Sequence, residues 1–80
     1  MAMYKEAGYL TKSGDVAFDK DHRPGTPTPF SGVYRCMGCG REVVSTQSHP
    51  MPPQNHHQHT PARGTIRWRL IVFADDKPKP

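Results

Sequence analysis

Long hydrophobic runs are missing from this chain of 80 residues, whose longest uninterrupted apolar stretch is residues 70–74. A helix that crosses a membrane needs about 20 mainly apolar residues, so we expect no membrane span and no membrane partner. Residues 1–10 contain Lys5 and Glu6 and lack the apolar centre of a secretory signal peptide. We therefore expect a cytoplasmic protein.

Hydrophobic residues are also scarce, at 34% of the chain. Domains below about 70–80 residues bury a small core and usually need disulfides, a metal or a partner for stability. This size excludes a multidomain enzyme and a doubly wound nucleotide-binding fold. The two cysteines, Cys36 and Cys39, are too few for a disulfide framework. In a reducing compartment such a pair more often binds metal or acts in catalysis.

Prolines cluster before the middle of the chain. Pro24, Pro27 and Pro29 fall within six residues, exclude a helix there and cannot donate hydrogen bonds to a sheet. We predict that residues 1–30 form an irregular, partly disordered arm. Residues 31–75 then form the folded domain, and residues 76–80 a disordered tail.

Three segments favour β-strands. Residues 33–36 and 41–46 are β-prone and flank a glycine-containing turn, which predicts a hairpin. A proline-rich and polar loop follows, and residues 65–73 then alternate between two faces. One face carries Ile66, Trp68, Leu70 and Val72, and the other carries Arg67 and Arg69. The sequence therefore predicts a small mainly-β fold with a three-stranded antiparallel sheet, which is marginal without added stabilisation.

The turn of the predicted hairpin places Cys36 and Cys39 in a C-x-x-C spacing that suits a tetrahedral metal. A redox dithiol would require a βαβ setting, which this chain lacks. His56 and His59 repeat the same spacing after sixteen intervening residues, so the four side chains predict one closed Cys2His2 zinc site per chain. The spare ligand candidates are His57 and His49. The alternative is that these histidines belong to a solvated polar loop.

The segment from Ser31 to Gly40 resembles the first half of small bacterial zinc-ribbon domains, which typically run G-x-Y-x-C-x-x-C-G. The likeness continues with Val43-Val44, then Pro52-Pro53, and finally the segment Trp68-Arg69-Leu70-Ile71-Val72. It covers about half of the chain. It implies a zinc-ribbon-like sheet that is closed by a strand bearing tryptophan.

The resemblance departs at the second knuckle, where the family has P-P-C-P-x-C. With Pro52-Pro53 aligned, Gln54 and His57 stand in place of the two cysteines. Glutamine is no zinc ligand, so either His56 and His59 supply the missing ligands or the chain is a metal-free, degenerate ribbon. In that second case, packing around the tryptophan holds the fold.

Catalysis is not expected. A closed four-ligand site is structural, whereas catalytic zinc keeps one position for water. Glu42 is the only acid near the site in sequence, and the H-x-E motif of zinc deaminases is absent. We therefore expect a binding module and not an enzyme.

A protein partner is the favoured expectation, or a weak homodimer through a sheet edge. The evidence is the proline-rich arm, the exposed edges of a three-stranded sheet, and Ile71 and Phe73, which alternation places away from the tryptophan face. The competing interpretation is that the arm folds back over that face through Phe18 and Phe30.

Nucleic-acid binding is the alternative function. Residues 32–73 carry five arginines against a single acid, with Tyr34 and Trp68 among them as rings for base stacking. The arginines are Arg35, Arg41, Arg63, Arg67 and Arg69. Against this, alternation directs Trp68 into the core. A third role, exchangeable binding of copper, nickel or zinc by the histidine-rich tract, is also open.

Overall fold

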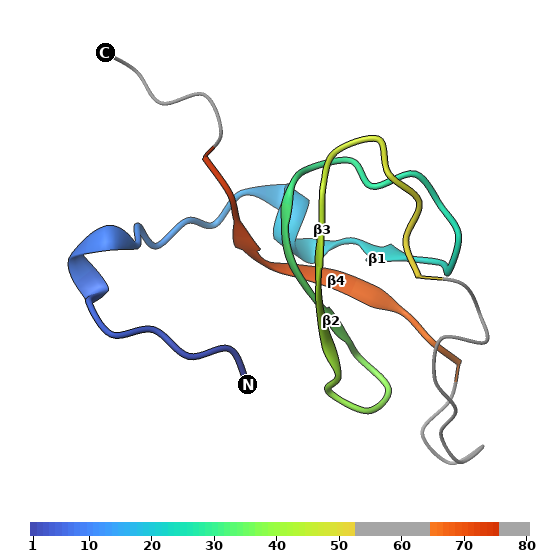
Figure 1. Cartoon of the computed structure of the whole chain (residues 1–80), viewed down its shortest axis with the longest axis horizontal. Coiled ribbons are helices and arrows are strands. Elements are labelled where there is room, and N and C mark those ends of the chain that lie inside the picture. The colour runs from blue at the N-terminus through green and yellow to red at the C-terminus, as the bar shows by residue number, and fades with distance from the viewer. Residues whose placement is uncertain (53–64, 76–80) are drawn as a thin grey trace.

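The computed structural model describes residues 1–52 and 65–75. Figure 1 shows the whole chain. The described residues contain no α-helix and form two short 3-10 helices and four strands. These are η1 (Ala7–Tyr9), η2 (Val16–Asp19), β1 (Asp21–His22), β2 (Gly32–Cys36), β3 (Glu42–Ser45) and β4 (Trp68–Phe73). The predicted tail at 76–80 lies outside the described residues. Within them, no helix is long and apolar enough to cross a membrane.

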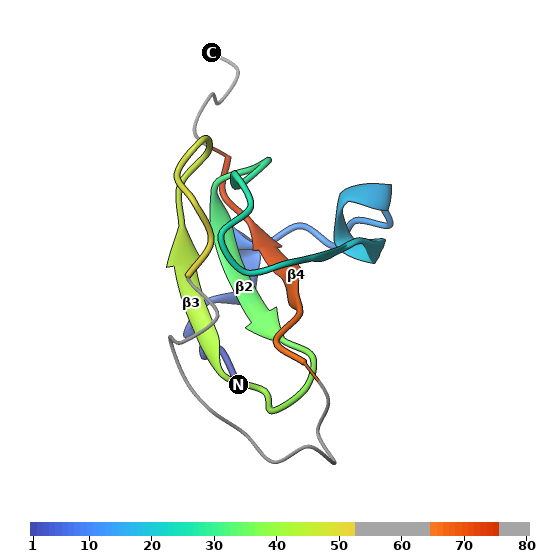
Figure 2. The ribbon, with the colours of Figure 1, turned by 90° about the vertical axis from the view of Figure 1, so that its right-hand side faces the viewer.

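The four strands form one antiparallel sheet in the order β1-β4-β2-β3. The mainly-β prediction is therefore confirmed, and so are the three predicted strands, which Figure 2 shows side by side. The prediction of only three strands is wrong, because β1 adds a fourth from within the predicted arm. Asp21 pairs with Arg69, and His22 with Trp68. A two-residue strand between charged neighbours is too short for any alternation to reveal it.

A bulge in β4 changes which face the end of that strand presents. Val33 pairs with Val72 but Tyr34 pairs with Leu70, so Ile71 is an extra residue. Beyond the bulge, Phe73 pairs with the buried Gly32 and lies on the same face as Tyr34. The predicted placement of Phe73 on the outer face is therefore wrong.

The arm folds back onto Phe73 through Phe18 and Phe30, but on the core face and not on the outer face that the competing interpretation named. The Phe73 ring lies 6.5 Å from the Phe18 ring and 5.1 Å from the Phe30 ring. Ala17, in η2, is buried in the core, and the Tyr34 hydroxyl donates a hydrogen bond of 2.6 Å to the carbonyl of Phe30. The second half of residues 1–30 is thus part of the folded unit.

A second layer covers one face of the sheet. Thr28 N–H donates to the carbonyl of His49, Ser48 N–H donates to that of Thr28, and Met51 N–H donates to that of Thr26. In Figure 1 these segments lie on one side of the strands and residues 1–15 on the other. The core between sheet and second layer consists of Ala17, Tyr34, Cys36, Met51, Ile66, Trp68 and Leu70.

Candidate metal centre

The C-x-x-C turn joins β2 to β3 and is held by three backbone hydrogen bonds. Gly40 N–H donates to the carbonyl of Cys36 at 2.7 Å, and Cys36 N–H donates to the carbonyl of Arg41 at 2.7 Å. Met37 N–H donates to the carbonyl of Arg67 at 2.8 Å, which ties the turn to the residue before β4. Gly40 has φ +84, a conformation that glycine adopts without strain.

Both cysteine side chains belong to the core side of this turn. Cys36 is fully buried and lies opposite Trp68 in the β2–β4 ladder. Cys39 is half-buried and packs against the same core cluster. Both cysteine side chains therefore contact the core from one tight turn, and a tetrahedral zinc site would take them as two of its four ligands.

Three of the predicted histidine candidates, His56, His57 and His59, lie outside the described residues. Met51 and Ile66, which bracket residues 53–64 in the sequence, belong to the same core cluster as Cys36. The described residues on either side of residues 53–64 therefore reach the core that contains the buried thiol.

His49 is described, and it does not join the cysteines. Its side chain is exposed, and the residue lies in the second layer next to Pro50, which bridges to Pro27. Residues 1–52 and 65–75 contain no group of three or more histidine, cysteine or acidic side chains able to hold a metal ion. In this part of the chain, the two cysteines are the part of the predicted Cys2His2 set that is described.

A positive charge lies beside the cysteine turn. A Cβ atom added to Gly40 would stand 3.1 Å from Nη2 of Arg35, so the guanidinium rests against this glycine. Thiols lose their protons when they bind a metal, and the nearby cation attracts the negative charge that results. The sequence marked Arg35 as a basic residue but gave no sign of this position.

The predicted arginine face is partly neutralised. The strand registers place Asp21, Arg69, Arg35 and Glu42 in one row across the sheet. Within the row, Arg69 Nε lies 2.7 Å from the Asp21 carboxylate. Arg41 and Arg67 are exposed, and Arg63 lies outside the described residues.

The rings proposed for base stacking point inward. Trp68 and Tyr34 are both 0% exposed, so neither is available for stacking on a nucleic acid. Burial raises the pKa of Tyr34, against the opposing effect of its hydrogen bond to the carbonyl of Phe30. The expectation that Trp68 faces the core is confirmed.

The chain has bacterial relatives but no match to a known family or fold. It is 50% identical over 56 residues to "Protein L" of Escherichia coli, an alignment that covers 70% of this chain and 63% of the relative. It is 45% identical over 40 residues to "Uncharacterized protein Rv1954A" of Mycobacterium tuberculosis, covering 50% of this chain and 40% of that relative. The chain thus spans less than two thirds of either relative. No family model and no solved structure matches it.

Proposed function

We propose that this chain is a small zinc-ribbon-like binding module, in which one structural Zn²⁺ holds a mainly-β domain that contacts a partner protein. Cys36 and Cys39 supply two ligands, and His56 and His59 supply the other two. The observation that carries the proposal is the cysteine turn, with its left-handed Gly40 and both side chains on the core side.

The size of the core supports a structural role for the metal. Only seven hydrophobic side chains among the described residues are buried, and three of the four strands have five residues or fewer. A structural zinc ion contributes its binding free energy directly to folding. With four protein ligands, no position is left for a reactive water, so we assign the metal no catalytic step.

A metal-free degenerate ribbon is the second candidate, and one observation favours it. Cys36 packs among Tyr34, Trp68 and Leu70 with no exposed surface, as a small apolar side chain would. In that case the thiol contributes to the core by packing, and the histidines play no part in stability.

The deciding experiment is elemental analysis of the untagged full chain, followed by chelation while the near-ultraviolet dichroism of Trp68 is recorded. We expect one zinc ion per chain and loss of the Trp68 signal when the metal is removed. Because Trp68 lies opposite Cys36 in the sheet, its signal reports directly on the site.

Variants then identify the ligands. Cys39→Ser, His56→Gln and His59→Gln are expected to leave well under one zinc per chain, because each removes a ligand. His49→Gln is the matched control, since His49 lies in the second layer, and it should retain the metal. A metal-free chain with an intact Trp68 signal would instead establish the degenerate ribbon.

A further inference from the structure

A groove of about 480 Å³ runs between the N-terminal arm and the end of β4. One wall carries Leu10 and Asp15, and the other carries Val72, Phe73 and the following Asp75. We call this hollow the arm groove. Its volume falls within the range of about 300–1,000 Å³ that is typical of ligand sites.

Aromatic rings line much of the arm groove. Phe73 is 44% exposed, and its ring lies 6.5 Å from that of Phe18, which also lines the groove. The Phe30 ring also packs against Phe73, with 5.1 Å between the two ring centroids. Tyr9 adds a ring that is 88% exposed. The faces of such rings carry partial negative charge and attract cations.

Among the described residues that line the arm groove, the charged ones are both acids, Asp15 and Asp75, although the whole chain has a net charge of +4. Asp15 is held in place because its carboxylate accepts the Ala17 N–H at 2.9 Å, at the start of η2. Rings and carboxylates together form a surface that is complementary to a cation carried on an apolar stem.

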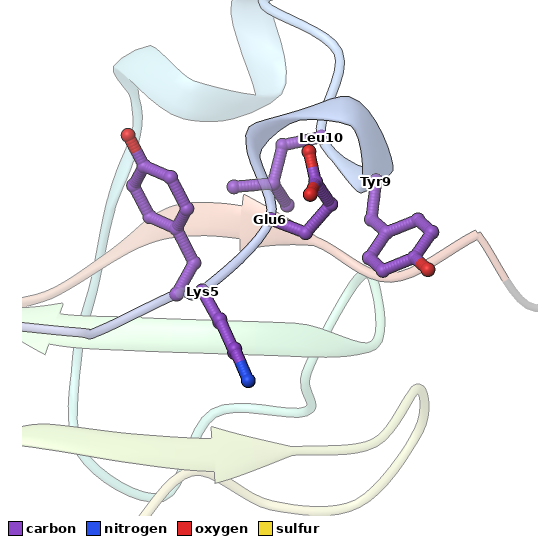
Figure 3. A pocket seen from close by; sticks show the side chains of 5 residues that line it. Lys5, Glu6, Tyr9 and Leu10 are labelled. Atoms are coloured by element: carbon purple, nitrogen blue, oxygen red, sulfur yellow. The ribbon is translucent and has the colours of Figure 1, made fainter.

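A second hollow, of about 420 Å³, continues along the arm and shares Tyr9 and Leu10 with the arm groove. Figure 3 shows its labelled side chains around η1, with the Lys5 ammonium and the Glu6 carboxylate pointing in opposite directions. The Glu6 carboxylate accepts the Gly8 N–H at 3.2 Å. The two hollows together offer an elongated surface, which fits an extended chain better than a compact small molecule.

We propose that the arm groove binds an extended basic segment of a partner protein, with an arginine or lysine side chain against the Phe18–Phe73 rings and its charge beside Asp15 and Asp75. This inference rests on the proposed role as a binding module and names the chemistry of the partner. The groove adjoins Phe73, at the opposite end of β4 from Trp68 and the cysteine turn. Metal binding and peptide binding can therefore fail independently.

The test measures fluorescence anisotropy of a labelled peptide with alternating arginine and leucine, titrated with the full chain. A peptide with glutamate in place of arginine is the matched probe. We expect the arginine peptide to bind, binding to weaken with added salt, and the glutamate peptide not to bind. The double variant Asp15→Asn and Asp75→Asn should weaken binding about tenfold, because it removes both carboxylates. Asparagine at position 15 preserves the cap on η2.

The control variant is Asp19→Asn, which removes an exposed acid outside the arm groove and should leave peptide affinity unchanged. Equal weakening by this control, or no weakening in the double variant, would overturn the proposal. Lys77→Gln with Lys79→Gln tests whether the chain's own tail is the occupant. If the parent chain does not bind the peptide and this tail variant does, the tail itself occupies the arm groove and the proposal of a partner segment is wrong.

Zinc content is measured on the same samples, so the two proposals are separated. Peptide binding by a chain without zinc would retain the arm groove and reject the metal site. A zinc-loaded chain that binds neither peptide would reject the groove and retain the metal site.

Discussion

Gly40 is the residue on which the shape of the cysteine turn depends. Its φ of +84 is costly for any residue with a Cβ atom, and that atom would also stand 3.1 Å from the Arg35 guanidinium. The turn could be predicted from the sequence, because glycines follow and separate the two cysteines. The contact with Arg35 could not, because it depends on the path of a long side chain across the turn.

Gly40→Ala is expected to destabilise the chain by about 1–2 kcal/mol, through backbone strain and displacement of Arg35. Urea unfolding of the zinc-loaded protein measures the change. Two other glycines separate the causes. Gly25 has φ +79 but open space around its Cβ position, so Gly25→Ala reports the backbone strain alone. Gly14 has neither a positive φ nor a neighbour at its Cβ position, so Gly14→Ala should be nearly neutral. Equal effects of all three would contradict this explanation.

At the scale of elements, the strands that alternate clearly were predictable and the irregular ones were not. β4 gave the strongest pattern, with Trp68 and Leu70 on one face, and it forms as expected. The bulge at Ile71 breaks that period, so the sequence placed Phe73 on the wrong face. β1 lies in a segment with no periodicity, and only its pairing with Arg69 and Trp68 makes it a strand.

The docking of β1 should make stability depend on pH through His22. Burial lowers the pKa of His22 below its ordinary value of 6.5, with Asp21 acting in the opposite direction and Lys20 in the same direction. The histidine ring lies 6.0 Å from that of Tyr34, edge to face. The unfolded chain therefore binds a proton on His22 more readily than the folded chain does. Neutral His22 contributes stability above the pKa that it has in the unfolded chain, and this contribution is lost as the pH falls through its pKa in the folded chain.

The measurement is the free energy of urea unfolding near pH 7.5 and near pH 5.5, for the parent chain and for His22→Gln. We expect the parent to lose more stability on acidification than the variant does. The comparison cancels the contribution of the other histidines, which both chains share. An identical pH dependence in the two proteins would show that His22 titrates alike when folded and unfolded.

At the scale of the whole molecule, the second layer is the feature that could not be predicted from the sequence. Residues 1–30 were predicted as an arm, because the prolines at positions 24, 27 and 29 exclude a helix and interrupt strands there. The backbone of Thr26 and Thr28 nevertheless pairs with residues 48–51, and these contacts join residues twenty or more positions apart. Local composition carries no information about such pairing, so the layer that closes the core was not foreseen.

A buried pair of hydroxyl groups links this second layer to the sheet. Thr28 and Ser45 are 2% and 8% exposed, and their hydroxyl oxygens lie 2.5 Å apart. Thr28→Val should cost about 1–3 kcal/mol, because it leaves the Ser45 hydroxyl buried without its partner. Adding Ser45→Ala removes that unsatisfied group, so the double variant should be more stable than the sum of the two single losses predicts.

A double-mutant cycle in urea measures this coupling, with the exposed Thr46→Val as the control, expected to change stability by less than about 0.5 kcal/mol. Coupling between positions 28 and 45 would mean that the second layer unfolds together with the sheet, because the interaction is lost only when the two separate. Strictly additive losses would mean that the two layers are held by apolar packing around Met51, and that the hydroxyl pair contributes nothing specific to their association.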